Sequence, residues 1–213
     1  LDPRCPMESI VKLFAGTFAF GGAAVASCLA VVAAHVRKLP SIPEGSLLSS
    51  RLQECEHVDA FVTSVPLHQL KFPVDDMQHP RNSIIHFSRA FFCSPAFRVE
   101  RKILSLALDE HNQDMSDEMI QKMDFEVGQK VALFTVTSQS QYEVLFDWGH
   151  GFTWLGVGAA ENSLSGDRLP TVNLYLGSSI TKWPPFSKAL LPSHYLYSMV
   201  LLGSARYQMM KSH

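Results

Sequence analysis

The sequence is short of charged residues. Asp, Glu, Lys and Arg make up 18% of its 213 residues, whereas about a quarter is usual for a soluble domain. The 18 basic and 20 acidic side chains nearly cancel and leave a formal net charge of -2. A nucleic-acid-binding protein normally carries a basic surplus on one face. The composition therefore excludes nucleic acid as an expected partner.

Closely spaced cysteine pairs are also missing. The four cysteines are Cys5, Cys28, Cys55 and Cys93, and no two of them form a CxxC pair. Cysteine-based zinc sites need such pairs, because two ligands must reach one ion from one turn. Cys28 lies within an apolar run, which argues against a disulfide framework. We therefore expect free, mostly buried thiols.

Sequence motifs for catalysis are absent as well. The chain contains no GxSxG, P-loop, dinucleotide fingerprint or HExxH motif. His57, His68 and His79 are spaced 11 residues apart, but Pro66 and Pro73 prevent them from sharing one helix. We interpret that spacing as chance. The sequence thus predicts no catalytic residue, no metal and no cofactor other than a bound lipid.

The longest uniform feature is an apolar run of 22 residues, Leu13–Ala34, with no charge, proline or amide side chain. A helix of that length spans about 33 Å, enough for a hydrocarbon core of about 30 Å. Pro40 and Pro43 then end the helix and begin an extended linker. We predict an N-terminal membrane anchor over residues 1–38, with its helix at about 10–36.

Two other interpretations of this run are less favoured. A secretory signal peptide has an apolar region of about 7–15 residues, so the run is too long, although Val25-Ala26-Ser27-Cys28 resembles a bacterial lipoprotein cleavage box. A buried core helix needs a domain around it, and the proline-bounded linker would separate the run from one. The chain begins at Leu1, as expected after removal of an organellar presequence; the alternative is that Met7 is the natural start.

Small residues recur every four positions along the run. One row consists of Gly22, Ala26, Ala30 and Ala34, and an adjacent row consists of Ala15, Ala19, Ala23 and Ser27. Residues of this size let a second helix approach closely. We therefore expect membrane lipid and other transmembrane subunits as partners. Mixed charges before the helix leave its orientation open.

The rest of the chain is expected to contain an irregular linker over 39–57 and one domain over 58–213. The predicted helices are 82–92, 95–108 and a long one from Ser193 onward; the predicted strands are 58–65, 131–137, 142–147, 152–158 and 171–177. This order predicts an α+β fold in which an antiparallel sheet wraps a long C-terminal helix. One transmembrane helix precedes the fold.

Two of these helices have an expected buried face. In helix 95–108 the predicted apolar face is Val99, Ile103 and Leu106, and the predicted solvated face is Arg98, Glu100 and Arg101. In the C-terminal helix the predicted stripe is Leu196, Val200, Gly203, Tyr207 and Met210. We expect this stripe to pack on the sheet, with Gly203 allowing close contact.

Several short segments carry a family resemblance. They are Asp59-Ala60-Phe61 before Pro66, Ala90–Pro95, Phe125–Gly128 with Phe134, Glu143–Leu145, Asp147–Phe152 and Pro192-Ser193-His194. In order and spacing they resemble the DUF2867 proteins of the START-like (SRPBCC, helix-grip) group. The resemblance implies a helix-grip domain with an apolar pocket and no established chemistry. The anchor and the acidic stretch 109–124 depart from that pattern, and one or two edge strands are expected within 66–80 or 124–130.

Candidate ligand and polar sites follow from this fold. The predicted lining of a lipid pocket is Phe134, Phe146, Trp154, Leu176, His194, Leu196 and Val200. Asp147 and His150 flank a tight turn, where the aspartate would either orient the imidazole or hydrogen-bond turn amides. Gly149 and Gly151 would permit positive φ, and we favour the structural interpretation.

These observations together predict a membrane-anchored, non-catalytic accessory or assembly subunit of a larger membrane protein complex. The expected location is the mitochondrial inner membrane, and a respiratory chain complex is the expected kind of assembly. The alternative is a membrane-tethered protein that binds or transfers a lipid or another hydrophobic ligand. A third hypothesis, an enzyme using Asp147 and His150, requires both groups to converge on the pocket.

Overall fold

The computed structural model describes residues 31–72, 79–107, 116–159, 170–182 and 191–210. Most of the predicted anchor, including Gly22, Ala26 and Ala30, therefore lies outside the described residues. Within them, no helix combines the length and the apolar character that crossing a bilayer requires.

The described strands form a seven-stranded antiparallel sheet in the order β1-β2-β7-β6-β5-β4-β3. The strands are β1 (Arg37–Lys38), β2 (His57–Pro66), β3 (Lys130–Val131), β4 (Phe134–Gln139), β5 (Glu143–Asp147), β6 (Phe152–Ala159) and β7 (Thr171–Ile180). The pairing of β2 with β7 brings the first and last long strands side by side. The α+β class and the antiparallel meander are confirmed.

The helical elements are η1 (Ser49–Glu54), η2 (Leu67–Gln69), α4 (Pro80–Phe92), α5 (Pro95–Ala107), α6 (Asp117–Ile120) and α7 (Leu191–Met209). The local sequence explains where two of these helices begin. The Ser94 hydroxyl accepts a hydrogen bond from the Phe97 amide at 3.3 Å, and Ser116 does the same for Met119 at 3.3 Å. Each serine satisfies an amide that the first helical turn leaves unpaired.

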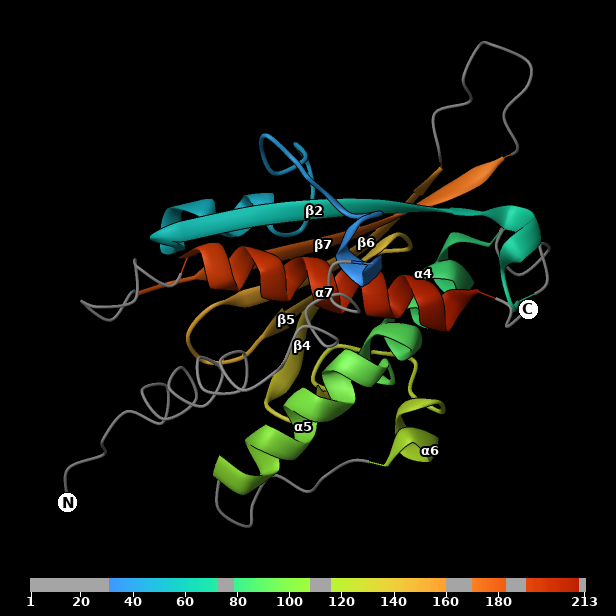
Figure 1. Ribbon diagram of the computed structural model, residues 1–213. Helices are drawn as coiled ribbons and strands as arrows, with labels where there is room; N and C mark the ends of the chain where they lie inside the picture. Colours follow the sequence, from blue (N-terminus) through green and yellow to red (C-terminus); the bar gives the residue numbers. More distant parts are fainter. Residues whose placement is uncertain (1–30, 73–78, 108–115, 160–169, 183–190, 211–213) are drawn as a thin grey trace.

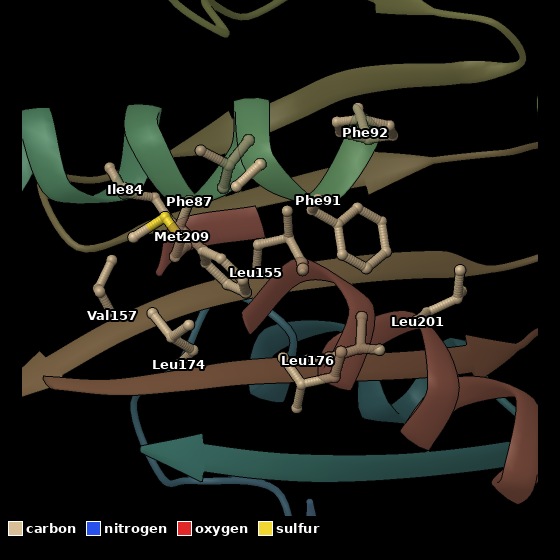
Figure 2. Packing of buried hydrophobic residues seen from close by; sticks show 14 of the residues in the cluster. Ile84, Phe87, Phe91, Phe92, Leu155, Val157, Leu174, Leu176, Leu201 and Met209 are labelled. Atoms are coloured by element: carbon tan, nitrogen blue, oxygen red, sulfur yellow. The ribbon is translucent and has the colours of Figure 1, made fainter. Parts of the chain in front are cut away.

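The largest buried cluster lies between the sheet and the helices α4 and α7. Figure 1 shows α7 running across one face of the sheet, with α4 and α5 on the same side. Figure 2 shows side chains from three sources meeting there: Ile84, Phe87, Phe91 and Phe92 of α4, Leu155, Val157, Leu174 and Leu176 of β6 and β7, and Leu201 and Met209 of α7. The C-terminal helix therefore packs on the sheet as predicted.

The predicted helix faces are wrong in part. In α5, Val99 is 52% exposed, whereas Glu100 and Arg101 are buried. The side chains of Ile103 and Leu106 lie outside the part of the chain that the structure describes. The spacing of apolar residues did not predict which face of α5 is buried. Glu100 and Arg101 can be buried because they have polar partners on α7 and α6, described below.

The predicted stripe on α7 is also wrong in part. Val200 and Gly203 are buried, but Leu196 and Tyr207 are 39% and 40% exposed. The chain buries the middle of the helix on almost every side, from Val200 to Ala205. Segments of the chain other than the sheet therefore also cover α7.

The segment predicted as a linker is a packed cover on the opposite face of the sheet. Leu48 is fully buried, and it packs with Ala60, Leu145, Phe152 and Trp154. The residues that surround this cluster include Leu39, Ile42, Leu47 and Cys55. Prolines and glycine made the segment irregular, as expected, but its apolar side chains still found a surface to bury.

The end of the apolar run joins the domain directly. Helical residues end at Ala33, three positions before the predicted end at about residue 36, and Ala34 is an exposed turn residue. Ala33 and Val36 are buried. A Cβ added at Gly203 would collide with the carbonyl of Val32, so Gly203 allows close contact with this segment and not with the sheet.

The exit from the run is fixed by hydrogen bonds as well as by packing. β1 pairs with β2, the Leu39 amide donates to the Ala60 carbonyl at 2.8 Å, and the Thr63 hydroxyl donates to the His35 carbonyl at 2.8 Å. We call residues 31–39 the stem. The expectation that a linker separates the run from the domain is corrected by these contacts.

Candidate functional site

The strongest cluster of potential ligands begins on β2. Side chains alternate between the two faces of a strand, so His57, Asp59 and Phe61 share one face. Phe61 belongs to the core under α7, which places His57 and Asp59 on the α7 side. The Asp59 side chain has no exposed surface, whereas 15% of the His57 side chain is exposed.

The first turn of α7 completes the cluster with His194. Its Nε2 lies 3.1 Å from Asp59 Oδ2, and His57 Nε2 lies 3.0 Å from the same oxygen. The His194 side chain is 20% exposed. One buried carboxylate therefore lies between two imidazoles that both reach the surface. We refer to His57, Asp59 and His194 as the His–Asp–His cluster.

Neighbouring aromatic and basic residues form one wall of this cluster. The ring centroid of Tyr195 lies 5.9 Å from that of His57 and 6.3 Å from that of Phe61. Lys38 of the stem places its ammonium 3.5 Å from the Tyr195 ring centroid, a cation–π contact. The stem therefore contributes a positive charge to the surroundings of the cluster.

Two polar atoms of the cluster lack hydrogen bonds within the described part of the chain. Asp59 Oδ1 is buried and has no partner. His194 Nε2 is near Asp59 Oδ2 but does not meet hydrogen-bond geometry, so this nitrogen is also unsatisfied. Leaving a buried carboxylate oxygen unpaired is unfavourable by about 1–3 kcal/mol or more. A further hydrogen-bond donor or a bound cation would satisfy the carboxylate oxygen.

A polar contact between buried Glu100 and half-buried Tyr197 joins α5 to α7. The Tyr197 hydroxyl donates to Glu100 Oε2. Burial raises the pKa of Glu100 to about 7, although the bond from Tyr197 acts in the opposite direction. Burial and the nearby carboxylate raise the pKa of Tyr197 well above its usual range. The pKa of Glu100 therefore lies near neutral pH, whereas Tyr197 keeps its proton there.

The same helix is connected to α6 by ion pairs. Arg98 and Arg101 both contact the carboxylate of Asp117. Arg101 is 7% exposed, and its guanidinium reaches one carboxylate oxygen while Arg98 reaches the other. Of the residues expected to form a solvated face, Arg98 is exposed, whereas Glu100 and Arg101 are buried and make tertiary contacts.

At the predicted polar site of Asp147 and His150, the Asp147 side chain makes a local contact within the turn. Asp147 Oδ1 accepts a hydrogen bond from the Gly149 amide at 2.6 Å, and Gly149 has φ +86°. The His150 carbonyl accepts from Thr181. Gly151 does not have a positive φ. Glycine is required there because a Cβ would collide with the carbonyl of Ser179.

The predicted pocket residues do not share one cavity wall. Phe134, Phe146 and Leu176 belong to the core beneath the helices, whereas Trp154 lies in the cluster on the other face of the sheet. Val200 is buried and Leu196 is partly exposed. His194 contacts Asp59 and is the one predicted lining residue that joins a polar cluster.

Aromatic rings occupy the space where the pocket was expected. The centroid of Phe92 lies 4.8 to 5.9 Å from those of five other rings. These rings belong to Phe91, Phe97, Phe125, Phe134 and Phe146. Among the described residues, this interior is packed with side chains.

Comparison with known proteins identified no relative of the chain. No family model, curated protein or solved structure matches the chain. The resemblance to DUF2867 and START-like proteins therefore stays a prediction.

The His–Asp–His cluster was not predicted from the sequence. A His-x-Asp pair in a strand was the available signal, because residues two apart on a strand face the same way. His57 and His194 were each noted separately, but 137 residue positions divide them along the chain. Only the docking of α7 beside β2 brings the two imidazoles to one carboxylate.

Proposed function

We propose that the protein is a membrane-anchored, non-catalytic accessory or assembly subunit of a larger membrane protein complex, located in the mitochondrial inner membrane. In this proposal the part of the apolar run that precedes the stem, residues 13–30, spans the bilayer. The small-residue row from Gly22 to Ala30 then contacts transmembrane helices of other subunits. The domain is of the helix-grip type that the resemblance implies.

The stem is the observation that carries the proposal. Val32, Ala33 and Val36 pack onto the domain, and β1 extends its sheet. An anchor that continues into this stem would hold the domain in a fixed position and orientation beside the bilayer. A subunit that presents one surface to its neighbours benefits from such fixation, because less orientational freedom is lost on assembly.

The alternative of a lipid or hydrophobic-ligand carrier receives no support from the site. A carrier needs a pocket of about 300 Å³ or more, but rings fill the space between the sheet and helices α4 and α5. A fixed stem also suits shuttling between membranes less well than a flexible tether does. The accessory subunit is therefore the better proposal.

Native isolation of the full chain in a gentle detergent, followed by mass spectrometry, tests this function. We expect the chain to stay in the membrane pellet after alkaline carbonate extraction and to migrate with other membrane subunits. Extraction as a soluble protein, or migration as a lone monomer, would contradict the proposal.

Variants of the small-residue row sharpen this test. Gly22→Leu with Ala26→Leu should release the partner subunits while the chain stays in the membrane, because bulky side chains block close helix approach. Val25→Leu is the matched control, since it adds bulk outside the row and should keep the partners. If the double variant, the control variant and the unaltered chain retained the partner subunits equally, the role proposed for the small-residue row would be refuted.

A further inference from the structure

The most informative feature outside the proposed function is the His–Asp–His cluster. Its three potential ligand atoms, one from each side chain, all lie within 4.8 Å of one another. Two imidazole nitrogens and one carboxylate oxygen suit zinc and other divalent transition metals better than magnesium or calcium, which prefer oxygen ligands. Ligand chemistry therefore favours a zinc-like ion.

The distances in the cluster fit coordination to a single ion. Tetrahedral zinc, with bonds of about 2.0–2.1 Å, keeps its ligand atoms about 3.3 Å apart. The two distances from Asp59 Oδ2 to the imidazole nitrogens are 3.0 and 3.1 Å. A small outward movement of the two rings would create the space for an ion.

The unsatisfied atoms supply an independent reason. Among the described residues, buried Asp59 Oδ1 has no hydrogen-bond partner, and His194 Nε2 lies near Asp59 without hydrogen-bonding to it. Two ligand atoms of one ion likewise lie close together without a hydrogen bond between them. A bound cation would also offset the negative charge of a carboxylate that is fully buried.

We propose that His57, Asp59 and His194 bind one Zn²⁺ ion, with a water molecule as the fourth ligand. Three protein ligands with one exchangeable position is a common zinc arrangement. The ion links β2 to the first turn of α7 and so stabilises the start of that helix.

Zinc binding by the full chain in detergent tests this proposal, with a purification tag that contains no histidine. Protein stripped with a chelator should take up one equivalent of Zn²⁺ in competition with a chromophoric chelator. Bound zinc should raise the midpoint of thermal unfolding and slow amide exchange in the first turns of α7. Failure to bind one equivalent, or tighter binding of Mg²⁺ than of Zn²⁺, would overturn the site.

Single substitutions identify the ligands. Asp59→Asn and His194→Ala should each weaken zinc binding by about 100-fold or more, because loss of a ligand has at least the effect of losing an outer-shell partner. His68→Ala is the matched control, since His68 is exposed in η2, and it should bind zinc as the unaltered chain does. Unchanged affinity in Asp59→Asn, or an equal loss in His68→Ala, would refute the assignment.

A spectroscopic measurement on the unaltered chain guards against variants that fail to fold. Co²⁺ in place of Zn²⁺ should give the intense visible absorption of a four-coordinate site with nitrogen and oxygen ligands. Absence of this spectrum at one equivalent of Co²⁺ would count against the coordination proposed. This outcome is separate from the membrane tests, because neither the anchor nor a partner subunit enters it.

Discussion

Replacing Glu100 by glutamine should make the stability of the protein less dependent on pH. Glu100 is 8% exposed, and burial raises its pKa from an ordinary value of 4.5 to about 7. An amide of the same shape keeps an acceptor for the Tyr197 hydroxyl but carries no proton to lose. Comparison of the two proteins therefore isolates the effect of the buried charge.

The sign follows from proton binding in the two states. An unfolded chain releases the Glu100 proton near pH 4.5, whereas the folded chain keeps it until about pH 7. Between these pH values the folded state binds more protons, so the free energy of unfolding falls as pH rises. Below the unfolded pKa the effect vanishes, and above the folded pKa it is complete.

The difference between the two pKa values corresponds to about 3 kcal/mol, at about 1.4 kcal/mol per pH unit. Glu100→Gln should therefore be as stable as the unaltered chain near pH 4.5 and more stable by up to about 3 kcal/mol near pH 8. Urea unfolding in detergent, followed by circular dichroism at several pH values, measures this difference.

Two further variants make the test specific. Glu126→Gln is the matched control, because Glu126 is exposed, and it should show little pH-dependent change. Tyr197→Phe removes the hydrogen bond that lowers the pKa of Glu100, so stability should keep falling to higher pH. If Glu100→Gln changed stability equally at about pH 4.5 and pH 8, the reasoning about a buried, protonated carboxyl would be refuted.

Three other substitutions test the packing. Gly151→Ala should destabilise the fold by several kcal/mol in urea unfolding, because its Cβ meets the Ser179 carbonyl; a loss below about 0.5 kcal/mol would contradict that contact. Phe92→Ala should lower the free energy of unfolding by about 3–5 kcal/mol in the same assay. A loss as small as that caused by a substitution of an exposed residue would show that the ring cluster is absent. Gly203→Ala should separate the stem from α7, seen as faster amide exchange near Val32, whereas unchanged exchange would argue against close contact there.

Local pattern was sufficient to predict most elements of the domain. Alternating β-branched and aromatic residues predicted β2 and β4–β7. The Asp147 turn was also predictable, since the aspartate bonds to an amide two residues away. These features depend on neighbours in the chain, which a sequence displays directly.

The buried charges of α5 were not predictable in this way. Glu100 and Arg101 looked like surface residues because nothing nearby in the sequence satisfies them. Their partners, Tyr197 and Asp117, come from α7 and α6. Burial of a charged side chain becomes tolerable only when such distant groups are brought into contact.

By itself, the sequence determined the class of fold, the order of its elements and the apolar character of Leu13–Ala34, since composition and periodicity are local properties. The tertiary structure decided which faces are buried, that residues 39–55 cover the sheet, and that His194 meets His57 and Asp59. A site built from a strand and a helix far apart in the chain exists only after the sheet and α7 have packed together. Its chemistry could therefore be identified only from contacts in the folded protein.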